Sequence, residues 1–279
     1  MLGRIALDLT KDRNHQLRLE ATIQLAAKHK AELVGIYSSP VTNQYLRDDT
    51  VVPNEVATLM RSYVSGEAAE IRDNFTRLAA LAGIKASYRA PQGPTEEVLA
   101  LHSRYCDLLV MSQAGSVDGP SYSLRPSLTE AVITSAGRPV LVIPYIGHLN
   151  PIGRRVLFCW DNGRRAARAL ADAAPILHEA SNLIVLKVDE NLAQIQAQDI
   201  TPQDLNAYCA SKGYPAPEVI KKESLNYGIG NTILNAATDQ GCDLIVMGAY
   251  NRSRVREWVL GGTSKTLLQS MTVPILFSH

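Results

Sequence analysis

The hexapeptide Cys-Asp-Leu-Leu-Val-Met at residues 106–111 returns almost unchanged, as Cys-Asp-Leu-Ile-Val-Met, at residues 242–247. Each copy is a short, nearly continuous apolar run after an acidic residue, which is typical of a strand buried on both faces of a parallel sheet. A segment repeated this closely predicts a duplicated domain. In a chain of 279 residues each copy is then long enough to bury its own core.

The sequence around each hexapeptide alternates between apolar runs and amphipathic stretches. The expected strands cover residues 4–8, 32–37, 86–89, 107–111 and 140–144, and then 154–160, 183–188, 218–221, 243–247 and 273–277. The expected helices cover 15–30, 55–82, 95–104 and 127–136, and then 165–179, 192–212, 232–239 and 264–270. This order predicts an α/β protein with two tandem doubly wound domains, each a five-stranded parallel sheet with helices on both faces.

The expected domains are residues 1–146 and 151–279, joined by a short glycine- and proline-bearing link. Two finer expectations concern helices: 192–212 should break near Pro202, and Asn231 should cap 232–239. The last strand of each domain should lie at a sheet edge. Because exposed apolar edges invite pairing, we expect these two strands to pair with each other or across a homodimer.

Composition excludes several classes of protein. Lys plus Arg is 28 and Asp plus Glu is 27, so net charge favours neither nucleic acid nor a membrane surface. No apolar stretch approaches the roughly 18–20 residues of a membrane span, and residues 1–8 do not resemble a signal peptide, so we expect a cytoplasmic protein. The four cysteines form no CxxC pair, and Cys106 and Cys242, which open equivalent expected strands, are interpreted as small hydrophobic residues. The histidines show no metal spacing.

The two hexapeptides lead into different loops. After the second come Gly248 and Asn251, and then Gly261-Gly262-Thr263-Ser264 before the last helix. This loop follows the carboxyl end of a central parallel strand, where open α/β sheets bind ligands. The N-terminus of a helix presents unpaired N–H groups, which favour an anion. The loop therefore predicts an anion or phosphate site.

Here the sequence resembles the universal stress protein family, whose nucleotide-binding signature is Gly, two residues, Gly, nine residues, Gly, then Ser or Thr. Gly248 and Gly261 match the first and third glycines at the correct separation. Asn251 stands at the second glycine, and Gly262 stands at the Ser/Thr position with Thr263 after it. The ending of the chain and the layout of both halves also look like a tandem universal stress protein.

The resemblance implies an ATP site, with Mg²⁺ accompanying the nucleotide. The family's ATP-binding members use an acidic residue after the first strand, and Asp161 fits; they use backbone groups at the end of the second strand, and Val188 fits. By the same resemblance the triphosphate would lie on Gly248, Asn251, Arg252, Gly261, Gly262, Thr263 and Ser264. Two alternatives stay open: Asp161 is a turn or capping residue, and the glycine loop is only a structural strand-to-helix turn.

The first half lacks this glycine spacing. Pro120 and Pro126 remove N–H donors, and Asp118 adds negative charge where a phosphate would sit. Asp8 is expected to keep the acidic position after the first strand. We expect this domain to be degenerate, that is, structural or specific for something other than a nucleotide.

Weaker signals leave more than one interpretation. Residues 227–232 contain GxG, which favours a plain turn over a cofactor site. Arg252, Arg254 and Arg256 either clamp phosphates or face solvent, and Arg164, Arg165 and Arg168 either flank the site or are solvated helix positions. No P-loop, GxSxG elbow or general base can be read from the sequence.

The sequence thus predicts a cytoplasmic stress-response protein whose second domain binds ATP or a related adenine nucleotide as a regulatory ligand. Enzymatic activity is not expected beyond slow ATP hydrolysis. The alternative is a nucleotide-free scaffold or chaperone-like interaction protein that works through protein partners. A small-ligand enzyme of the wider adenine-nucleotide α/β group is the weakest alternative, since the motifs of such enzymes are missing.

Overall fold

A computed structural model describes residues 1–12, 14–38, 54–113, 127–145, 151–189, 201–249 and 262–279. The chain forms two compact units, Leu2–Val140 and Leu141–His279. The expected domain limits at residues 146 and 151 and the pairing of the two last strands stay predictions. Within the described residues no helix is long and apolar enough to cross a membrane.

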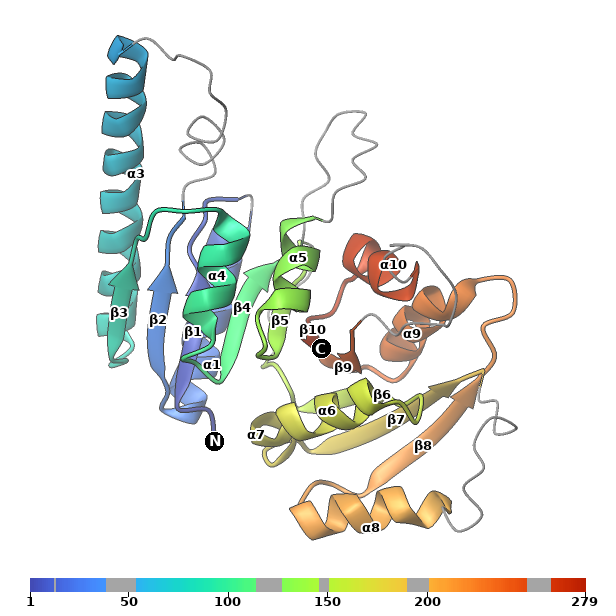
Figure 1. Cartoon of the computed structure of the whole chain (residues 1–279). Coiled ribbons are helices and arrows are strands. Elements are labelled where there is room, and N and C mark those ends of the chain that lie inside the picture. Colours follow the sequence, from blue (N-terminus) through green and yellow to red (C-terminus); the bar gives the residue numbers. More distant parts are fainter. Residues whose placement is uncertain (13, 39–53, 114–126, 146–150, 190–200, 250–261) are drawn as a thin grey trace. The chain divides into compact units, whose positions relative to one another are not determined.

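The first half folds as an α/β sheet with the strand order β3-β2-β1-β4-β5. Its elements are β1 (Arg4–Asp8), α1 (His15–His29), β2 (Glu32–Ile36), α3 (Asn54–Leu81), β3 (Ala86–Arg89), α4 (Thr95–Ser103), β4 (Leu108–Ser112), α5 (Leu128–Ser135) and β5 (Val140–Ile143). The pairs β1–β2, β1–β4 and β2–β3 are parallel. Figure 1 shows α4 and α5 on one face of this sheet, and α1 on the other.

The second half repeats this topology with the strand order β10-β9-β6-β7-β8, and its four strand pairs are parallel. Its elements are β6 (Arg155–Cys159), α6 (Arg164–Asp172), α7 (Ala174–Leu177), β7 (Asn182–Val188), α8 (Pro202–Lys212), β8 (Pro217–Lys222), α9 (Gly228–Asp239), β9 (Leu244–Gly248), α10 (Gly262–Ser270) and β10 (Ile275–Ser278). The predicted fold class, a doubly wound parallel α/β arrangement in tandem, is confirmed.

Some helix limits differ from expectation. The helix expected over 165–179 is split into α6 and α7, and Pro175, which has no N–H to donate, stands at the start of the second piece. Of the helix expected over 192–212, the part from Pro202 onward is observed as α8, which begins behind a capping box of Thr201 and Asp204, and residues 192–200 lie outside the described residues. The N-cap assigned to Asn231 is wrong.

The helix α9 begins three residues before the expected cap, at Gly228. That glycine has φ +75°, a conformation that an L side chain rarely adopts, so the chain turns directly into the helix there. Asn231 lies inside the helix, and its Nδ2 donates to the carbonyl of Tyr227 at 2.9 Å. Its side chain therefore supports the first turn from within.

The aspartate of the repeated hexapeptide has the same structural role in both units. The carboxylate of Asp107 accepts the N–H groups of Gly3 and Arg4 at 2.7 and 2.9 Å. The carboxylate of Asp243 accepts those of residues 153–155 at 2.7 to 3.2 Å. In both units the aspartate thus ties the start of the first strand to the start of its neighbour, β4 or β9, and the apolar residues that follow are buried.

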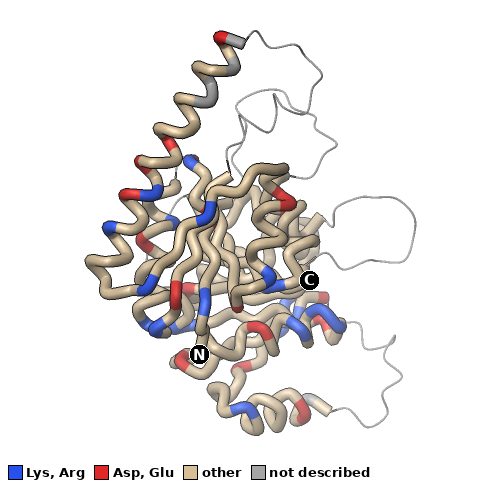
Figure 2. The backbone as a smooth tube through the Cα atoms, turned by 60° about the vertical axis from the view of Figure 1, so that its left-hand side comes forward, with Lys and Arg blue, Asp and Glu red and all other residues tan. Residues whose placement is uncertain are grey.

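Charged residues of both signs are interspersed along the described chain, as Figure 2 shows. This distribution agrees with the near balance of 28 basic and 27 acidic residues. The described surface therefore carries mixed charge rather than a field of one sign.

Candidate functional site

The candidate site of the second unit lies at the carboxyl ends of its parallel strands. Since β6 pairs in parallel with β7 and β9, their last residues, Cys159, Val188 and Gly248, lie along one edge of the sheet. The helices α6, α9 and α10 each connect one parallel strand to the next, so each begins at this same edge (Figure 1). Three positive helix ends therefore gather where the sequence predicts a phosphate site.

Asp161 is exposed directly after β6, and it shapes the turn into α6. Its Oδ1 accepts the N–H of Gly163 at 2.8 Å, and a Cβ at Gly163 would lie 2.7 Å from that oxygen. Between them Asn162 has φ +59°, and its Oδ1 accepts the indole N–H of Trp160 at 2.6 Å. Asp161 is thus a turn residue, which is one of the two interpretations of the sequence. The same turn fixes the indole ring of Trp160 through Asn162.

Gly248 closes β9 at a point of close packing. A Cβ there would lie 2.7 Å from the carbonyl carbon and the Cβ of Arg165, and 2.9 Å from the nitrogen of Ala166. These are largely backbone atoms of the first turn of α6, which cannot move aside. The absence of a side chain at Gly248 therefore lets the end of β9 approach α6 closely.

Gly230 has a role that the sequence analysis did not assign. A Cβ on this residue would lie 2.8 Å from the Cβ of Thr266 and 3.3 Å from the carbonyl oxygen of Thr263. Its missing side chain lets the first turn of α9 pack against the first turns of α10. The GxG sequence was a signal for this contact, and it brings two helix N-termini together.

The beginning of α10 presents the described part of the glycine loop. Gly262 is exposed, Thr263 is half-buried, and Ser264 is 3% exposed. The hydroxyl of Ser264 is therefore turned into the protein rather than toward a ligand. Asn251, Arg252 and Gly261, together with Arg254 and Arg256, lie outside the described residues, so their expected roles stay predictions.

The end of β7 is fixed by a polar link. Val188, half-buried, pairs with Lys222 of β8. The following residue, Asp189, has φ +49°, and its carboxylate accepts the N–H and Oγ–H of Ser224 at 2.8 and 2.5 Å. These hydrogen bonds hold the pKa of the Asp189 carboxyl below its usual value. The backbone beside Val188 is thereby fixed at the carboxyl edge.

Of the arginines expected to flank the site, Arg168 is bound elsewhere. Its Nε donates to both carboxylate oxygens of Asp172, one turn further along α6, at 2.9 and 3.0 Å. A nitrogen of Arg165 lies 3.0 Å from Nε2 of His279, beyond the end of β10. Only Arg164 and Arg165, in the first turn of α6, lie next to the edge.

The acidic position assigned to Asp8 in the first half is wrong. Asp8 pairs with Ile36 in β2 as Cys159 pairs with Leu186 in β7, so Asp8 corresponds to Cys159. Thr10, two residues later, corresponds to Asp161. The two acidic residues look equivalent in the sequence because strand pairing, which sets the register, is not visible there.

An arginine fills the corresponding edge of the first unit. Arg18 of α1 is 1% exposed and reaches across the ends of β1 and β4. Its Nη1 donates to Asp12 and, at 2.5 Å, to Ser112, the residue that corresponds to Gly248. Its Nη2 donates to the carbonyl of Thr10 at 2.5 Å. A side chain of the protein itself therefore links the ends of β1 and β4 at this edge.

Comparison with known proteins places the second unit in a family. Residues 153–279 match the model described as "Universal stress protein family", so this part of the chain belongs to the universal stress protein family. No curated protein matches the sequence.

Solved structures share the fold of the whole chain. A universal stress protein from Archaeoglobus fulgidus DSM 4304 is 19% identical, with a TM-score of 0.70 over 98% of this chain and 97% of that chain. A putative universal stress protein from Pseudomonas aeruginosa UCBPP-PA14 is 15% identical, with a TM-score of 0.59 over 99% of this chain and 93% of that one. At these identities the likeness shows the fold alone.

Proposed function

We propose that this chain is a stress-response protein of the cytoplasm whose second unit binds ATP or a related adenine nucleotide as a regulatory ligand. The observation that carries the proposal is the convergence of the N-termini of α6, α9 and α10 at the carboxyl edge of one sheet, beside the partial glycine signature. Unpaired N–H groups and helix dipoles favour a polyanion at such an edge.

In this proposal the nucleoside lies along the ends of β6 and β7. The exposed carboxylate of Asp161 accepts a ribose hydroxyl, and backbone groups at Val188 contact the base. The phosphates lie over the first turn of α10, on the N–H groups of Gly262 and Thr263, with Asn251, Arg252 and Gly261 completing the loop. Ser264 contributes its backbone rather than its buried hydroxyl.

The described residues fit Mg²⁺ only as a companion of the nucleotide. Within the described part of the chain no three acidic, histidine or cysteine side chains gather closely enough to hold a metal. Mg²⁺ is commonly held by substrate phosphates and water with one or two carboxylates. The phosphates would be its main ligands here, and Asp161, in the turn before α6, is an exposed acidic side chain at the same edge.

A second candidate, a nucleotide-free interaction protein, is favoured by a specific observation. Gly248 packs against α6 and Asp161 closes a turn, so each of these two signature positions has a structural task without any ligand. The nucleotide-binding protein and the interaction protein differ in whether the second unit binds an adenine nucleotide, so a measurement of that binding separates them.

The first experiment is the nucleotide content of protein purified without added ligand. The protein is denatured, and ATP, ADP and AMP in the supernatant are compared with protein concentration by ion-exchange chromatography. About one adenine nucleotide per chain supports the proposal. No nucleotide, together with no thermal shift on adding Mg-ATP, would favour the interaction protein.

A matched pair of glycine variants separates binding from folding. A Cβ at Gly262 meets no described atom within 4 Å, so Gly262→Asp should keep the fold, while its carboxylate would repel a phosphate on α10. Gly66→Asp, in α3 of the first unit, where a Cβ likewise meets no described atom within 4 Å, is the control. We expect ATP to bind at least tenfold more weakly to the Gly262 variant only. Equal affinity of the two variants for ATP would contradict the proposed position of the phosphates at α10.

A further inference from the structure

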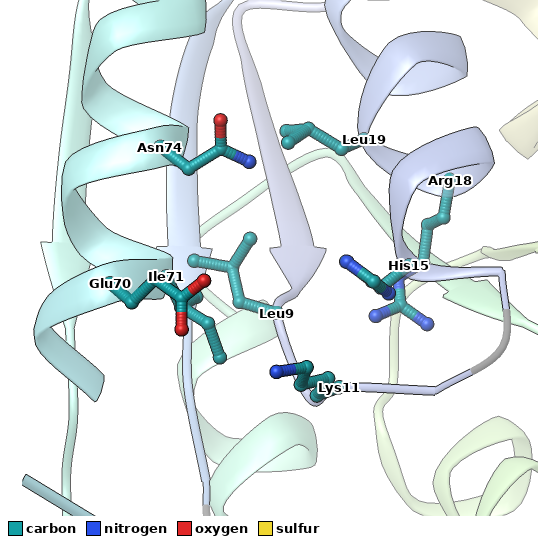
Figure 3. A pocket seen from close by; sticks show the side chains of 8 residues that line it. All are labelled: Leu9, Lys11, His15, Arg18, Leu19, Glu70, Ile71 and Asn74. Carbon is teal, nitrogen blue, oxygen red and sulfur yellow. The ribbon is translucent and has the colours of Figure 1, made fainter. Parts of the chain in front are cut away.

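A cavity of about 90 Å³ lies in the first unit, between α1 and α3 and beside the chain that leaves β1. It is lined by Leu9, Lys11, His15, Arg18, Leu19, Glu70, Ile71 and Asn74. Figure 3 shows Glu70 and Asn74 on one wall, facing His15 and Arg18 on the other. Since a buried water needs roughly 10–15 Å³ of such space, the cavity has room for about six non-hydrogen atoms.

One wall offers hydrogen-bond donors. Arg18 is buried, and its two Nη atoms are engaged with Asp12, Ser112 and Thr10. Its Nε is also buried, and it has no hydrogen-bond partner among the described residues. A buried N–H of a cation without a partner is costly, so an acceptor in the adjoining cavity would stabilise it. The ammonium of Lys11 is a second donor, 4.0 Å from its nearest carboxylate oxygen, that of Glu67.

The imidazole of His15 has a defined polarity. Its Nδ1 lies 2.7 Å from the carbonyl oxygen of Asp12. A carbonyl oxygen can only accept, so Nδ1 carries the hydrogen. In the neutral ring Nε2 is then an acceptor. This wall therefore presents two cationic donors and one acceptor.

The opposite wall, on α3, presents an acid. Glu70 is exposed, and within the described part of the chain it makes no hydrogen bond or ion pair. One turn further, Oδ1 of Asn74 accepts a hydrogen bond from Arg77 at 2.8 Å. The amide nitrogen of Asn74 is turned toward the cavity in Figure 3. Leu9, Leu19 and Ile71 supply the apolar surface between the walls.

This arrangement selects for a ligand with two opposite charges. A simple anion would meet the carboxylate of Glu70, and a simple cation would meet Lys11 and Arg18. We propose that the cavity binds a small α-amino acid as its zwitterion. The carboxylate accepts from Nε of Arg18 and from Lys11, the ammonium donates to Glu70 and to Nε2 of His15, and a short side chain packs on the leucines. This site is independent of the nucleotide proposal.

Equilibrium dialysis of the full chain against radiolabelled glycine, L-alanine and L-serine tests the proposal. We expect saturable binding of at least one of them, at one site per chain. Propionate, which lacks the ammonium, and ethylamine, which lacks the carboxylate, should each bind at least tenfold more weakly. No saturable binding of any of the three amino acids would overturn the proposal, and so would equal binding of propionate.

Charge-neutral variants locate the site. Glu70→Gln and Lys11→Met should each weaken binding of the amino acid at least tenfold, because each removes one charged partner while keeping the size of the side chain. Glu20→Gln and Lys85→Met are controls, since these residues are exposed and do not line the cavity. Unchanged binding in both cavity variants would overturn the proposal. Circular dichroism should show all four variants folded.

Discussion

The guanidinium of Arg18 lies 3.9 Å from the carboxylate of Asp8, and both side chains are buried at the carboxyl edge of the first sheet. Charges removed from water must be paired and hydrogen-bonded. Arg18 meets this condition through Asp12, Ser112 and Thr10, and so joins α1 to the ends of β1 and β4. Arg18 is thus a buried cation of the first unit's own, placed at the carboxyl edge of its sheet.

Arg18→Met should destabilise the first unit by about 3–5 kcal/mol, because it leaves a buried carboxylate without its cation. Hydrogen exchange of the amide groups in β1 and β4 measures this loss in the first unit specifically. Arg77→Met, at an exposed position of α3, is the control and should change exchange little. A loss below about 1 kcal/mol at position 18 would contradict the structural role of the arginine.

The same pair predicts a dependence of stability on pH. Burial raises the pKa of the Asp8 carboxyl above 3.8, and the charge of Arg18 opposes that rise. A carboxyl group whose folded pKa is raised binds its proton more tightly in the folded state. Its contribution to stability is therefore full below pH 3.8 and is lost as pH rises through the folded pKa. Without Arg18 the pKa of the Asp8 carboxyl should rise further, so the pH range over which this contribution to stability is lost should widen.

Comparing Arg18→Met with the double variant Arg18→Met/Asp8→Asn tests this linkage. We expect the single variant to lose stability as pH rises from 4 to 7, and the double variant to be more stable than the single one at pH 7. The measurement is the free energy of unfolding from hydrogen exchange, corrected for the pH dependence of intrinsic exchange. Parallel curves for the two variants would show that Asp8 is not the titrating group.

Gly248→Ala should destabilise the second unit by about 1–3 kcal/mol, because its Cβ would overlap the backbone of α6. Gly262→Ala, where the Cβ meets no described atom within 4 Å, should be neutral or slightly stabilising, since alanine is the better helix former. Urea unfolding, followed by the tryptophan fluorescence of the second unit, compares the two. Equal stability of the variants would mean that α6 shifts at no cost, which contradicts the packing role of Gly248.

The repeated hexapeptide was enough to predict the fold, because apolar strands, acidic strand starts and helix spacing are local properties that recur in both units. The register was not predictable: Asp8 and Asp161 look equivalent in sequence, and only the pairing of β1 with β2 shows that Thr10 matches Asp161. Nor does a helical pattern reveal a buried arginine, since arginine is normally exposed and the partners of Arg18 come from distant segments. The packing role of Gly230 likewise depends on a tertiary contact.

Cys159 provides a chemical probe of the candidate site. Burial, and to a lesser degree the neighbouring charge of Asp161, together raise the pKa of its thiol to about 12. Because the thiolate is the reactive form, a thiol with this pKa is about 0.01% ionised at pH 8, against roughly a quarter for an unperturbed thiol of pKa near 8.5. The native protein should therefore resist iodoacetamide at Cys159 over hours at pH 8.

Mass spectrometry of the alkylated peptides measures the labelling of Cys159. In urea all four cysteines should react at similar rates, which controls for the reagent. Asp161→Asn keeps the turn acceptor for Gly163 but removes the negative charge, so the thiol pKa should fall and native labelling of Cys159 should become faster. Labelling that is as slow in this variant as in the parent would show that burial alone sets the thiol pKa. Native labelling as fast as in urea would contradict the raised pKa of this half-buried thiol at the end of β6.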